Sequence, residues 1–209
     1  NSTIKNSHGK DGGGIYSTGD LVMDKSTVRD NTSRNNGGGL AISAKEADAT
    51  LSIVNCTIAF NTALSGGAVG GGIYFEADAG HIIDSQISNV TIASNITGGE
   101  GKNIYENTLT GSSEINTTYT NTILDNPGPN YTASQTGVHN TIRTYTICSD
   151  NSLDATGIGN MNNTDPLLKA IADNGGETET MALRGNSPAI DAGTLKGVPR
   201  TDQTGKVRP

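Results

Sequence analysis

Few side chains in the sequence could do acid–base chemistry, and they are widely spaced. Asp30 and Asp125 each lie two residues after a recurring aliphatic residue, so stacked copies of a repeat could place two carboxylates on one face. Paired carboxylates at a defined separation can supply the acid and the base or nucleophile of glycoside hydrolysis. The copies between them carry Phe60 and Ser94 at the same position, which interrupts the row. The pattern therefore does not favour a glycosidase site.

The three histidines also lack the partners that catalysis needs. His8 stands in an isolated His-Gly dipeptide near the start of the sequence, and we expect His81 and His139 in separate loops. None of them has a Ser or Cys motif that would complete a nucleophilic site. The sequence therefore predicts no catalytic residue.

Acidic residues close together in the sequence are the candidates for a metal site. Glu76 with Asp78, or Asp20 with Asp24, could hold Ca²⁺ weakly in a loop, but a solvated acidic loop is the interpretation we favour for both pairs. The glycine triplets do not have the spacing of a phosphate-binding loop. We therefore predict no metal site and no cofactor.

All of these side chains belong to a repeat, which must position them. Its core motif is x-Thr-Ile-x-x-Asn, with clear copies at residues 26–31, 56–61, 90–95 and 121–126. A glycine motif follows at residues 12–16, 37–40 and 70–74 and weakens at 101–105, and a third apolar segment recurs at 21–23, 51–53 and 83–87. The aliphatic residues that mark the copies are Ile4, Val28, Ile58, Ile92, Ile123 and Ile147.

Short recurring motifs joined by loops of varying length are typical of a solenoid. Successive marker residues are 24, 30, 34, 31 and 24 positions apart. The words are β-branched and too short for helices, and Gly and Asn suit corners. We therefore predict an all-β parallel β-helix of about six coils with three short strands each. The markers should form an inward aliphatic column, Thr an outward column, and Asn31, Asn61, Asn95 and Asn126 a corner column.

The last part of the chain changes in character. Residues 1–164 carry the repeat, whereas residues 165–209 contain four of the six prolines and no copy of it. Residues 165–176 fit a short helix and a pair of tight turns equally well. We expect residues 165–209 to form a turn-rich capping segment packed on the end of the β-helix.

Both parts resemble known bacterial surface proteins. The Gly-Gly-x-Ile and Ile-x-x-Asn words resemble the repeats of chlamydial polymorphic outer membrane proteins and related adhesins, which implies a right-handed parallel β-helix. In those families the corresponding repeat motifs are usually Gly-Gly-Ala-Ile and Phe-x-x-Asn. Residues 165–209 resemble the C-terminal region of choice-of-anchor Q domain proteins, through the words Asp-Pro-x-Leu, Ala-Asp-Asn-Gly-Gly, Ser-Pro-Ala-Ile-Asp-Ala-Gly and Thr-Asp-Gln-x-Gly-x-x-Arg-Pro.

Charge limits the kinds of partner. The net charge of −7 lies wholly within residues 1–164, which hold 8 Lys and Arg against 15 Asp and Glu. An acidic solenoid argues against nucleic acid and anionic lipid as partners. No apolar run reaches membrane-spanning length, and the sequence begins within a coil, so we expect either removal of upstream sequence or an open edge that docks on another molecule.

We expect a non-catalytic extracellular or cell-surface protein with a structural or adhesive role. Its partners would be an extracellular glycan or protein, or a second copy stacked end to end in a filament. The alternative is a carbohydrate-active β-helix enzyme, a polysaccharide lyase or hydrolase.

Two smaller expectations follow from the repeat. Cys56 and Cys148 lie three coils apart, about 14 Å at the strand spacing, so we predict no disulfide between them and a core position for Cys56. Tyr16, Tyr74 and Tyr105 share one position in the glycine motif. They could form an exposed aromatic stripe, but we favour mutual packing along the column.

Overall fold

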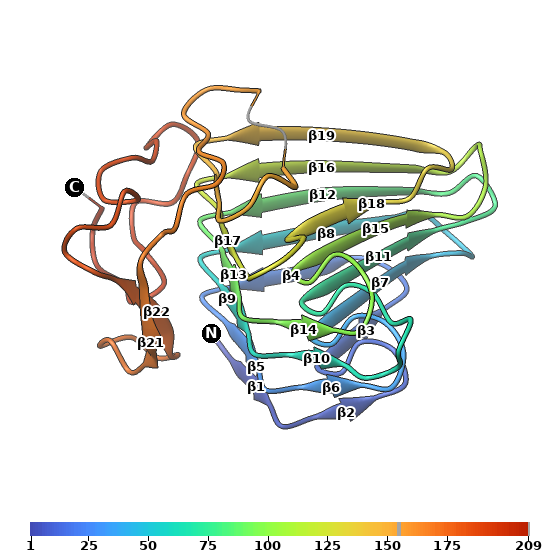
Figure 1. Ribbon diagram of the computed structural model, residues 1–209, viewed down its shortest axis with the longest axis horizontal. Coiled ribbons are helices and arrows are strands. Elements are labelled where there is room, and N and C mark those ends of the chain that lie inside the picture. The colour runs from blue at the N-terminus through green and yellow to red at the C-terminus, as the bar shows by residue number, and fades with distance from the viewer. Residues whose placement is uncertain (154–155, 209) are drawn as a thin grey trace.

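The protein is a parallel β-solenoid, which confirms the fold expected from the sequence (Figure 1). The computed structural model describes residues 1–153 and 156–208, and within these ranges the chain forms strands β1 to β22 and no helix. Strands from successive coils pair in parallel in four sheets, here called sheets A to D. Four coils are complete and contribute a strand to every sheet, while a fifth and a sixth are partial, so the expected count of about six coils is slightly too high.

The sheets differ in the length of their strands. Sheet A contains β1 (Thr3–Lys5), β5 (Thr27–Arg29), β9 (Thr57–Ala59), β13 (Thr91–Ala93), β17 (Ile123–Asp125) and β20 (Ile147–Cys148). Sheet B contains β2 (His8–Gly9), β6 (Thr32–Ser33), β10 (Thr62–Ala63) and β14 (Ile96–Thr97). Sheet C contains β3 (Ile15–Ser17), β7 (Leu40–Ala44), β11 (Ile73–Ala77), β15 (Ile104–Thr108) and β18 (Tyr131–Ala133). Sheet D contains β4 (Leu21–Asp24), β8 (Ala49–Val54), β12 (Ile82–Ser88), β16 (Glu114–Thr120) and β19 (Val138–Thr144).

Each complete coil therefore has four strands rather than the expected three. The additional one is the two-residue strand of sheet B, which directly follows the Asn of the core motif. It carries no aliphatic run: the first residue of each strand is exposed or half-buried and the second is small, as in His8–Gly9, Thr32–Ser33, Thr62–Ala63 and Ile96–Thr97. Strands this short give no periodic signal in a sequence.

Left-handed residues at the corners set the register of the coils. One column of them lies two residues before each later strand of sheet A: Lys25, Asn55, Asn89, Asn121 and Tyr145, with φ between 47° and 56°. A second column opens the glycine motif, and Gly37 shows why it needs glycine. Its φ is 66°, and a Cβ there would lie 2.3 Å from the backbone oxygen of Leu40.

The inward column of sheet A differs from the prediction in its last two members. Val28, Ile58 and Ile92 are successive Cα partners and are fully buried. Their next partners are Leu124 and Cys148, whereas Ile123 and Ile147 continue the outward column of Thr57 and Thr91. The predicted places of Ile123 and Ile147 are therefore wrong by one residue, and that slip exchanges the two faces of a strand.

Buried amides form a continuous hydrogen-bonded row at the corner between sheets A and B. Asn31 Nδ2 donates to Asn61 Oδ1 at 3.0 Å, and Asn61 Nδ2 donates to Asn95 Oδ1 at 3.0 Å. Asn95 Nδ2 then donates to Asn103 Oδ1 at 2.9 Å, and Asn126 Nδ2 donates to the same oxygen at 2.9 Å. Asn126 thus belongs to the row, but it joins through Asn103 rather than directly through Asn95.

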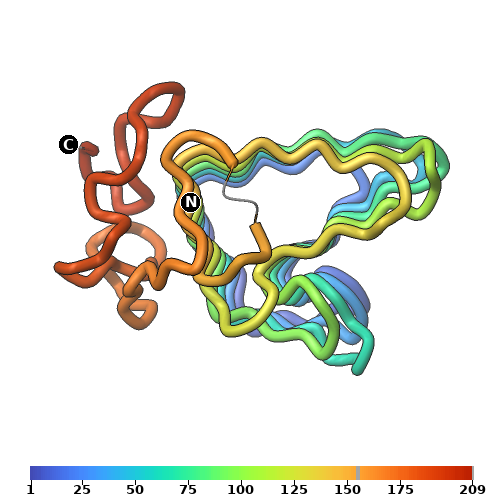
Figure 2. The backbone as a smooth tube through the Cα atoms, turned by 45° about the horizontal axis from the view of Figure 1, so that its top comes forward, coloured from blue at the N-terminus to red at the C-terminus, as the bar shows by residue number. Residues whose placement is uncertain are grey.

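The sequence predicts that the C-terminal segment packs on an end of the solenoid. Residues 165–208 lie instead against the outer face of sheet A (Figure 2). Residues 165–176, expected as a helix or tight turns, contain the strand β21 (Leu168–Ala172), which pairs antiparallel with β22 (Thr180–Leu183). The end of the solenoid is approached instead by the segment after β20. Met161 forms a parallel bridge with Ile147, and Leu153 is buried.

Candidate functional site

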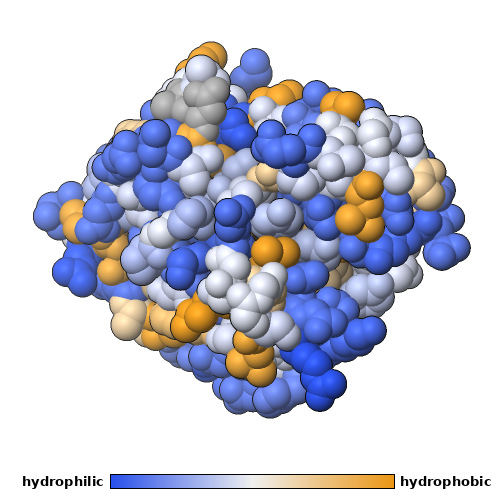
Figure 3. Space-filling view, turned by 45° about the vertical axis from the view of Figure 1, so that its right-hand side comes forward, coloured by the Kyte–Doolittle hydropathy of each residue, from blue (hydrophilic) through white to orange (hydrophobic). Residues whose placement is uncertain are grey.

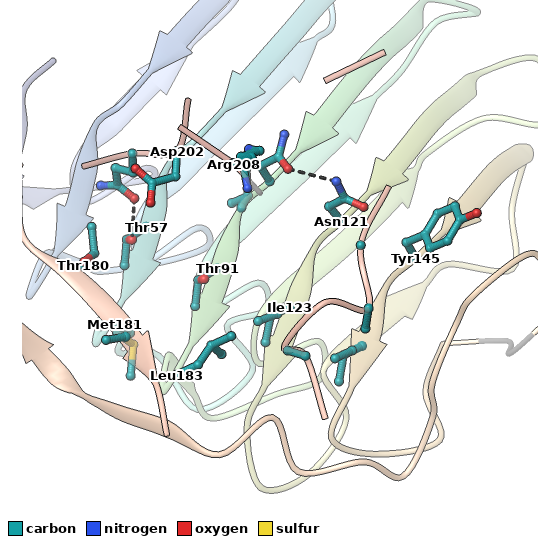
Figure 4. Close-up of a pocket in the computed structure, with 18 of the residues that line it drawn as sticks. Thr57, Thr91, Asn121, Ile123, Tyr145, Thr180, Met181, Leu183, Asp202 and Arg208 are labelled. Atoms are coloured by element: carbon teal, nitrogen blue, oxygen red, sulfur yellow. Dashed lines mark hydrogen bonds between the residues drawn. The ribbon is translucent and has the colours of Figure 1, made fainter. Parts of the chain in front are cut away.

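A groove of about 870 Å³ separates the C-terminal segment from sheet A (Figure 4). The outward residues Thr57, Thr91, Ile123 and Ile147 line one wall. Strand β22 and two later stretches of the C-terminal segment line the other wall. The volume is within the range of about 300–1,000 Å³ that is common for ligand sites in proteins.

The first end of the groove is closed by a network of side-chain hydrogen bonds centred on Gln203. Thr57 Oγ1 donates to Gln203 Oε1 at 2.8 Å, and Gln203 Nε2 donates to Thr27 Oγ1 at 3.0 Å. Thr27 Oγ1 in turn donates to the backbone oxygen of Glu179 at 2.6 Å. The Thr column is buried at Thr27 and Thr57 because the C-terminal segment covers it.

An ion pair adds to this closure. Arg29 Nε donates to Glu179 Oε2 at 2.8 Å, and Arg29 also pairs with its neighbour Asp30. Burial alone would lower the pKa of Arg29, but its hydrogen bonds to Glu179 and Asp30 raise it above its usual value. The pair is partly exposed, so it fixes position more than it adds stability.

Corner asparagines with left-handed backbone tie the C-terminal segment to one side of the groove. Asn121 Nδ2 donates to the backbone oxygen of Thr194, and the Thr194 amide donates back to Asn121 Oδ1, both at 2.8 Å. Along the side, Asn55 Nδ2 donates to the backbone oxygen of Thr201 at 3.2 Å, and Arg208 donates to Asn55 Oδ1 at 2.8 Å. An amide side chain can bond a peptide group in this two-way manner because it carries both a donor and an acceptor.

Beyond Thr57, the outward residues of sheet A that line the groove are not held to the C-terminal segment by the side-chain hydrogen bonds seen at Thr27 and Thr57. No hydrogen bond to the Thr91 hydroxyl occurs within the described chain, in contrast to those of Thr27 and Thr57. Ile123 is only partly buried, although it is aliphatic. The groove thus offers a hydroxyl and two aliphatic side chains on one wall, with Met181 and Leu183 on the other (Figure 4).

A second polar cluster lies inside the last coils of the solenoid, around the fully buried Glu106. Thr117 Oγ1 donates to Glu106 Oε1 at 2.8 Å, the Tyr131 hydroxyl donates to Oε2 at 2.7 Å, and His139 Nδ1 lies 3.3 Å from Oε2. Burial, together with the Glu106 carboxylate, raises the pKa of Tyr131. Arg143 lies 5.3 Å from the centre of the Tyr131 ring, and its Nε is buried without a hydrogen-bond partner.

The sequence carries one signal for this cluster, a carboxylate at an inward position of the repeat. Glu106 pairs with Phe75, which pairs with Ile42, so a carboxylate stands in an otherwise apolar inward column. The sequence predicts His139 in a loop, but it lies on β19, where it faces inward. Because Glu106 has no exposed surface, the cluster organises the interior of the last coils.

The other candidate residues do not converge on a site. Asp30 lies at the corner after β5, whereas Asp125 is a β17 residue in register with Ala93, so the two carboxylates occupy different columns. Burial raises the pKa of Asp125, with the nearby Asp165 adding to the effect. His8 is exposed on β2, and His81 lies 3.2 Å from Asp48 at the surface.

The acidic pairs have protein partners. Glu76 forms an ion pair with Lys45 at 2.7 Å, and Asp20 accepts hydrogen bonds from the backbone and the hydroxyl of Thr50. Across residues 1–153 and 156–208, no three His, Cys, Asp or Glu side chains gather closely enough to hold a metal ion.

Two of the three tyrosines in the glycine motif stack on each other. The ring centres of Tyr74 and Tyr105 lie 6.3 Å apart at an interplanar angle of 27°. Ala41 occupies the column between Tyr74 and Tyr16, so Tyr16 stands alone and is 54% exposed. The column therefore packs internally at one end and does not form a continuous stripe. Cys56 and Cys148 are both buried, free thiols.

Comparison of the chain with protein-family models, with curated proteins and with solved structures gives no match. Within the described ranges, no helix has the length and the apolar composition needed to cross a bilayer.

Proposed function

We propose that this protein is a non-catalytic extracellular or cell-surface protein in which a rigid solenoid carries a binding groove. The observation that carries the proposal is the groove between sheet A and the C-terminal segment, which hydrogen bonds close at the Gln203 end and bridge at Asn121 along one side. Its charged lining residues, Asp191, Asp202, Lys206 and Arg208, balance formally. Such a lining favours a neutral ligand.

The surface of the protein and its sequence motifs support the extracellular role. The face of the molecule in Figure 3 is mainly hydrophilic, with apolar side chains in small separate groups. The resemblance of the repeat to polymorphic outer membrane proteins, and of residues 165–209 to choice-of-anchor Q proteins, supports the proposal of a bacterial surface adhesin. An adhesive or structural role needs a stiff scaffold, and the buried amide row supplies stiffness at one corner.

End-to-end assembly is a further part of this proposal. Within the described chain, β1 to β4 at one end and β19 at the other each have a strand partner on one side only. A head-to-tail contact that pairs these edges would extend the parallel sheets and generate a filament. Electron microscopy and sedimentation across a concentration series test this, and isolated monomers at every concentration would contradict it.

A carbohydrate-active enzyme is the competing function, and one experiment separates the two. The purified protein is incubated with acidic and neutral polysaccharides, and the products are followed by reducing-end and unsaturated-sugar assays. The proposal expects binding to surfaces or polymers without cleavage. Time-dependent depolymerisation that scales with the protein concentration would refute it.

A further inference from the structure

The groove runs along the free edge of strand β22. All four residues of β22, Thr180, Met181, Ala182 and Leu183, line it. Successive side chains of a strand point to opposite faces, so a cavity on one face would meet only every second residue. Contact with four consecutive residues fits a groove that reaches the edge of the strand as well as the face that carries Met181 and Leu183.

The edge in question is the one that has no partner. Strands β21 and β22 form a two-stranded sheet, so within the described chain β22 pairs with β21 alone. No residue of β21 lines the groove. The groove therefore lies on the side of β22 away from β21, where a row of backbone groups is available for an added strand.

The residues of sheet A that line the groove suit the side chains of such a strand. Ile123 and Ile147 continue the outward column of sheet A, and Thr91 adds a hydroxyl. In parallel strands these positions follow one another at about 4.8 Å, so the row gives a narrow, mainly aliphatic floor. An extended segment beside β22 would place every second side chain on this floor.

We propose that the groove binds an extended, uncharged peptide segment of another polypeptide, as a third strand beside β22. The segment would alternate β-branched apolar residues, which meet Ile123 and Ile147, with polar residues that face away. Main-chain hydrogen bonds supply affinity in this mode of recognition, and pockets for alternate side chains supply selectivity. The inference deepens the proposed function and rests on the protein acting by binding.

Backbone methylation of the ligand gives a sharp test. The probes are fluorescein-labelled hexapeptides that alternate Val or Ile with Thr, acetylated and amidated at their ends. Two further versions are N-methylated, one at the odd and one at the even amides. A strand presents alternate amides to each edge, so pairing with β22 predicts that one methylated phase binds at least about tenfold more weakly while the other phase does not. Equal loss in both phases, or no saturable binding of any unmodified peptide, would overturn the inference.

A matched pair of variants locates the site. Thr91→Tyr fills the floor of the groove, whereas Thr3→Tyr makes the same change in the same column at an exposed position. We expect peptide affinity to fall about tenfold or more in Thr91→Tyr and to stay within about twofold of wild type in Thr3→Tyr. Equal affinities of the two variants would overturn the assignment.

The same protein is also applied to a glycan array. A glycan that binds while all peptides fail would overturn the strand inference and leave the binding function in place. Cleavage of a polysaccharide would instead refute the proposed function, whatever the peptides do.

Discussion

Replacing Asn61 by Ala tests whether the buried amide row holds the coils together. Asn61 is fully buried and makes four hydrogen bonds through its side chain. Its Nδ2 donates to the backbone oxygen of Val28 and to Asn95 Oδ1, both at 3.0 Å. Its Oδ1 accepts from the backbone amide and the Nδ2 of Asn31, at 3.1 and 3.0 Å. The variant Asn61→Ala removes all four bonds at once.

The expected loss is large because the substitution leaves the buried partners of the amide without these hydrogen bonds. A typical intramolecular hydrogen bond contributes about 1 kcal/mol net, so four contribute about 4 kcal/mol. Domains of this kind are stable by about 5–15 kcal/mol, so the change removes a substantial part of the free energy of unfolding. With a urea m value of about 2 kcal/mol per molar, the midpoint of unfolding should fall by about 2 M.

Urea unfolding followed by circular dichroism measures this change, with two companion variants. Asn140→Ala removes an exposed asparagine that donates to Glu114 and Asn116, and we expect a change within about 0.5 kcal/mol. Asn61→Asp keeps the volume but replaces two donors by an acceptor, so it should destabilise at neutral pH at least as much as Asn61→Ala. If Asn61→Ala costs no more than Asn140→Ala, the row does not stabilise the solenoid and the reasoning is wrong.

Three further predictions follow from buried groups. Burial raises the pKa of Cys56 and of Cys148 to about 12, so iodoacetamide near pH 8 should leave both thiols unmodified in the native protein and label both in urea, as counted by mass spectrometry. Glu106→Ala removes the shared acceptor of the interior cluster, and calorimetry or urea unfolding should show a loss of about 2–4 kcal/mol. Burial alone would raise the pKa of Asp150, but hydrogen bonds, first from Ser152, lower it overall. The carboxylate therefore contributes stability above its ordinary pKa of about 3.9 and loses it as the pH falls below that value, so the difference in unfolding free energy between wild type and Asp150→Asn should shrink steadily below about pH 4.

The general architecture was predictable because a solenoid repeats its contacts. Each coil contacts its neighbours at the same positions, so the residues of the aliphatic, Thr and Asn columns recur at matching positions of the repeat in the sequence. Val28, Ile58 and Ile92 lie in one column for this reason. The two-residue strands of sheet B have no recurring aliphatic or Asn residue, so the sequence does not predict this strand of each coil.

The register of the fifth coil was lost because two corners give different counts. The corner after the strand predicts Ile123 as the inward residue, because its distance from Asn126 equals the distance from Ile92 to Asn95. The corner before the strand gives the observed register: Asn121 lies two residues before Ile123, as Asn89 lies two residues before Thr91. The left-handed residue Ser94 has no equivalent after β17, so the following corner is shorter by one residue.

The groove could not be derived from the repeat. The C-terminal segment has no periodic contacts, and its place against sheet A depends on single residues such as Gln203 and Asn121. One indirect signal was present. An outward Thr row that changes to Ile123 and Ile147 is unusual for a surface open to water, and those two aliphatic side chains lie where the C-terminal segment covers the sheet.

The weakened glycine motif at residues 101–105 is better understood as a substitution that maintains the amide row. At Gly72 a Cβ would lie 3.0 Å from Asn95 Nδ2, so glycine makes room for the amide. In the next coil Asn126 arrives one residue early and does not meet Asn95 Oδ1. Asn103 occupies the position equivalent to Gly72 and accepts from both Asn95 and Asn126 at 2.9 Å. The shortened corner and the lost glycine therefore compensate each other, because Asn103 joins Asn95 and Asn126 in one row where Asn126 does not reach Asn95 Oδ1.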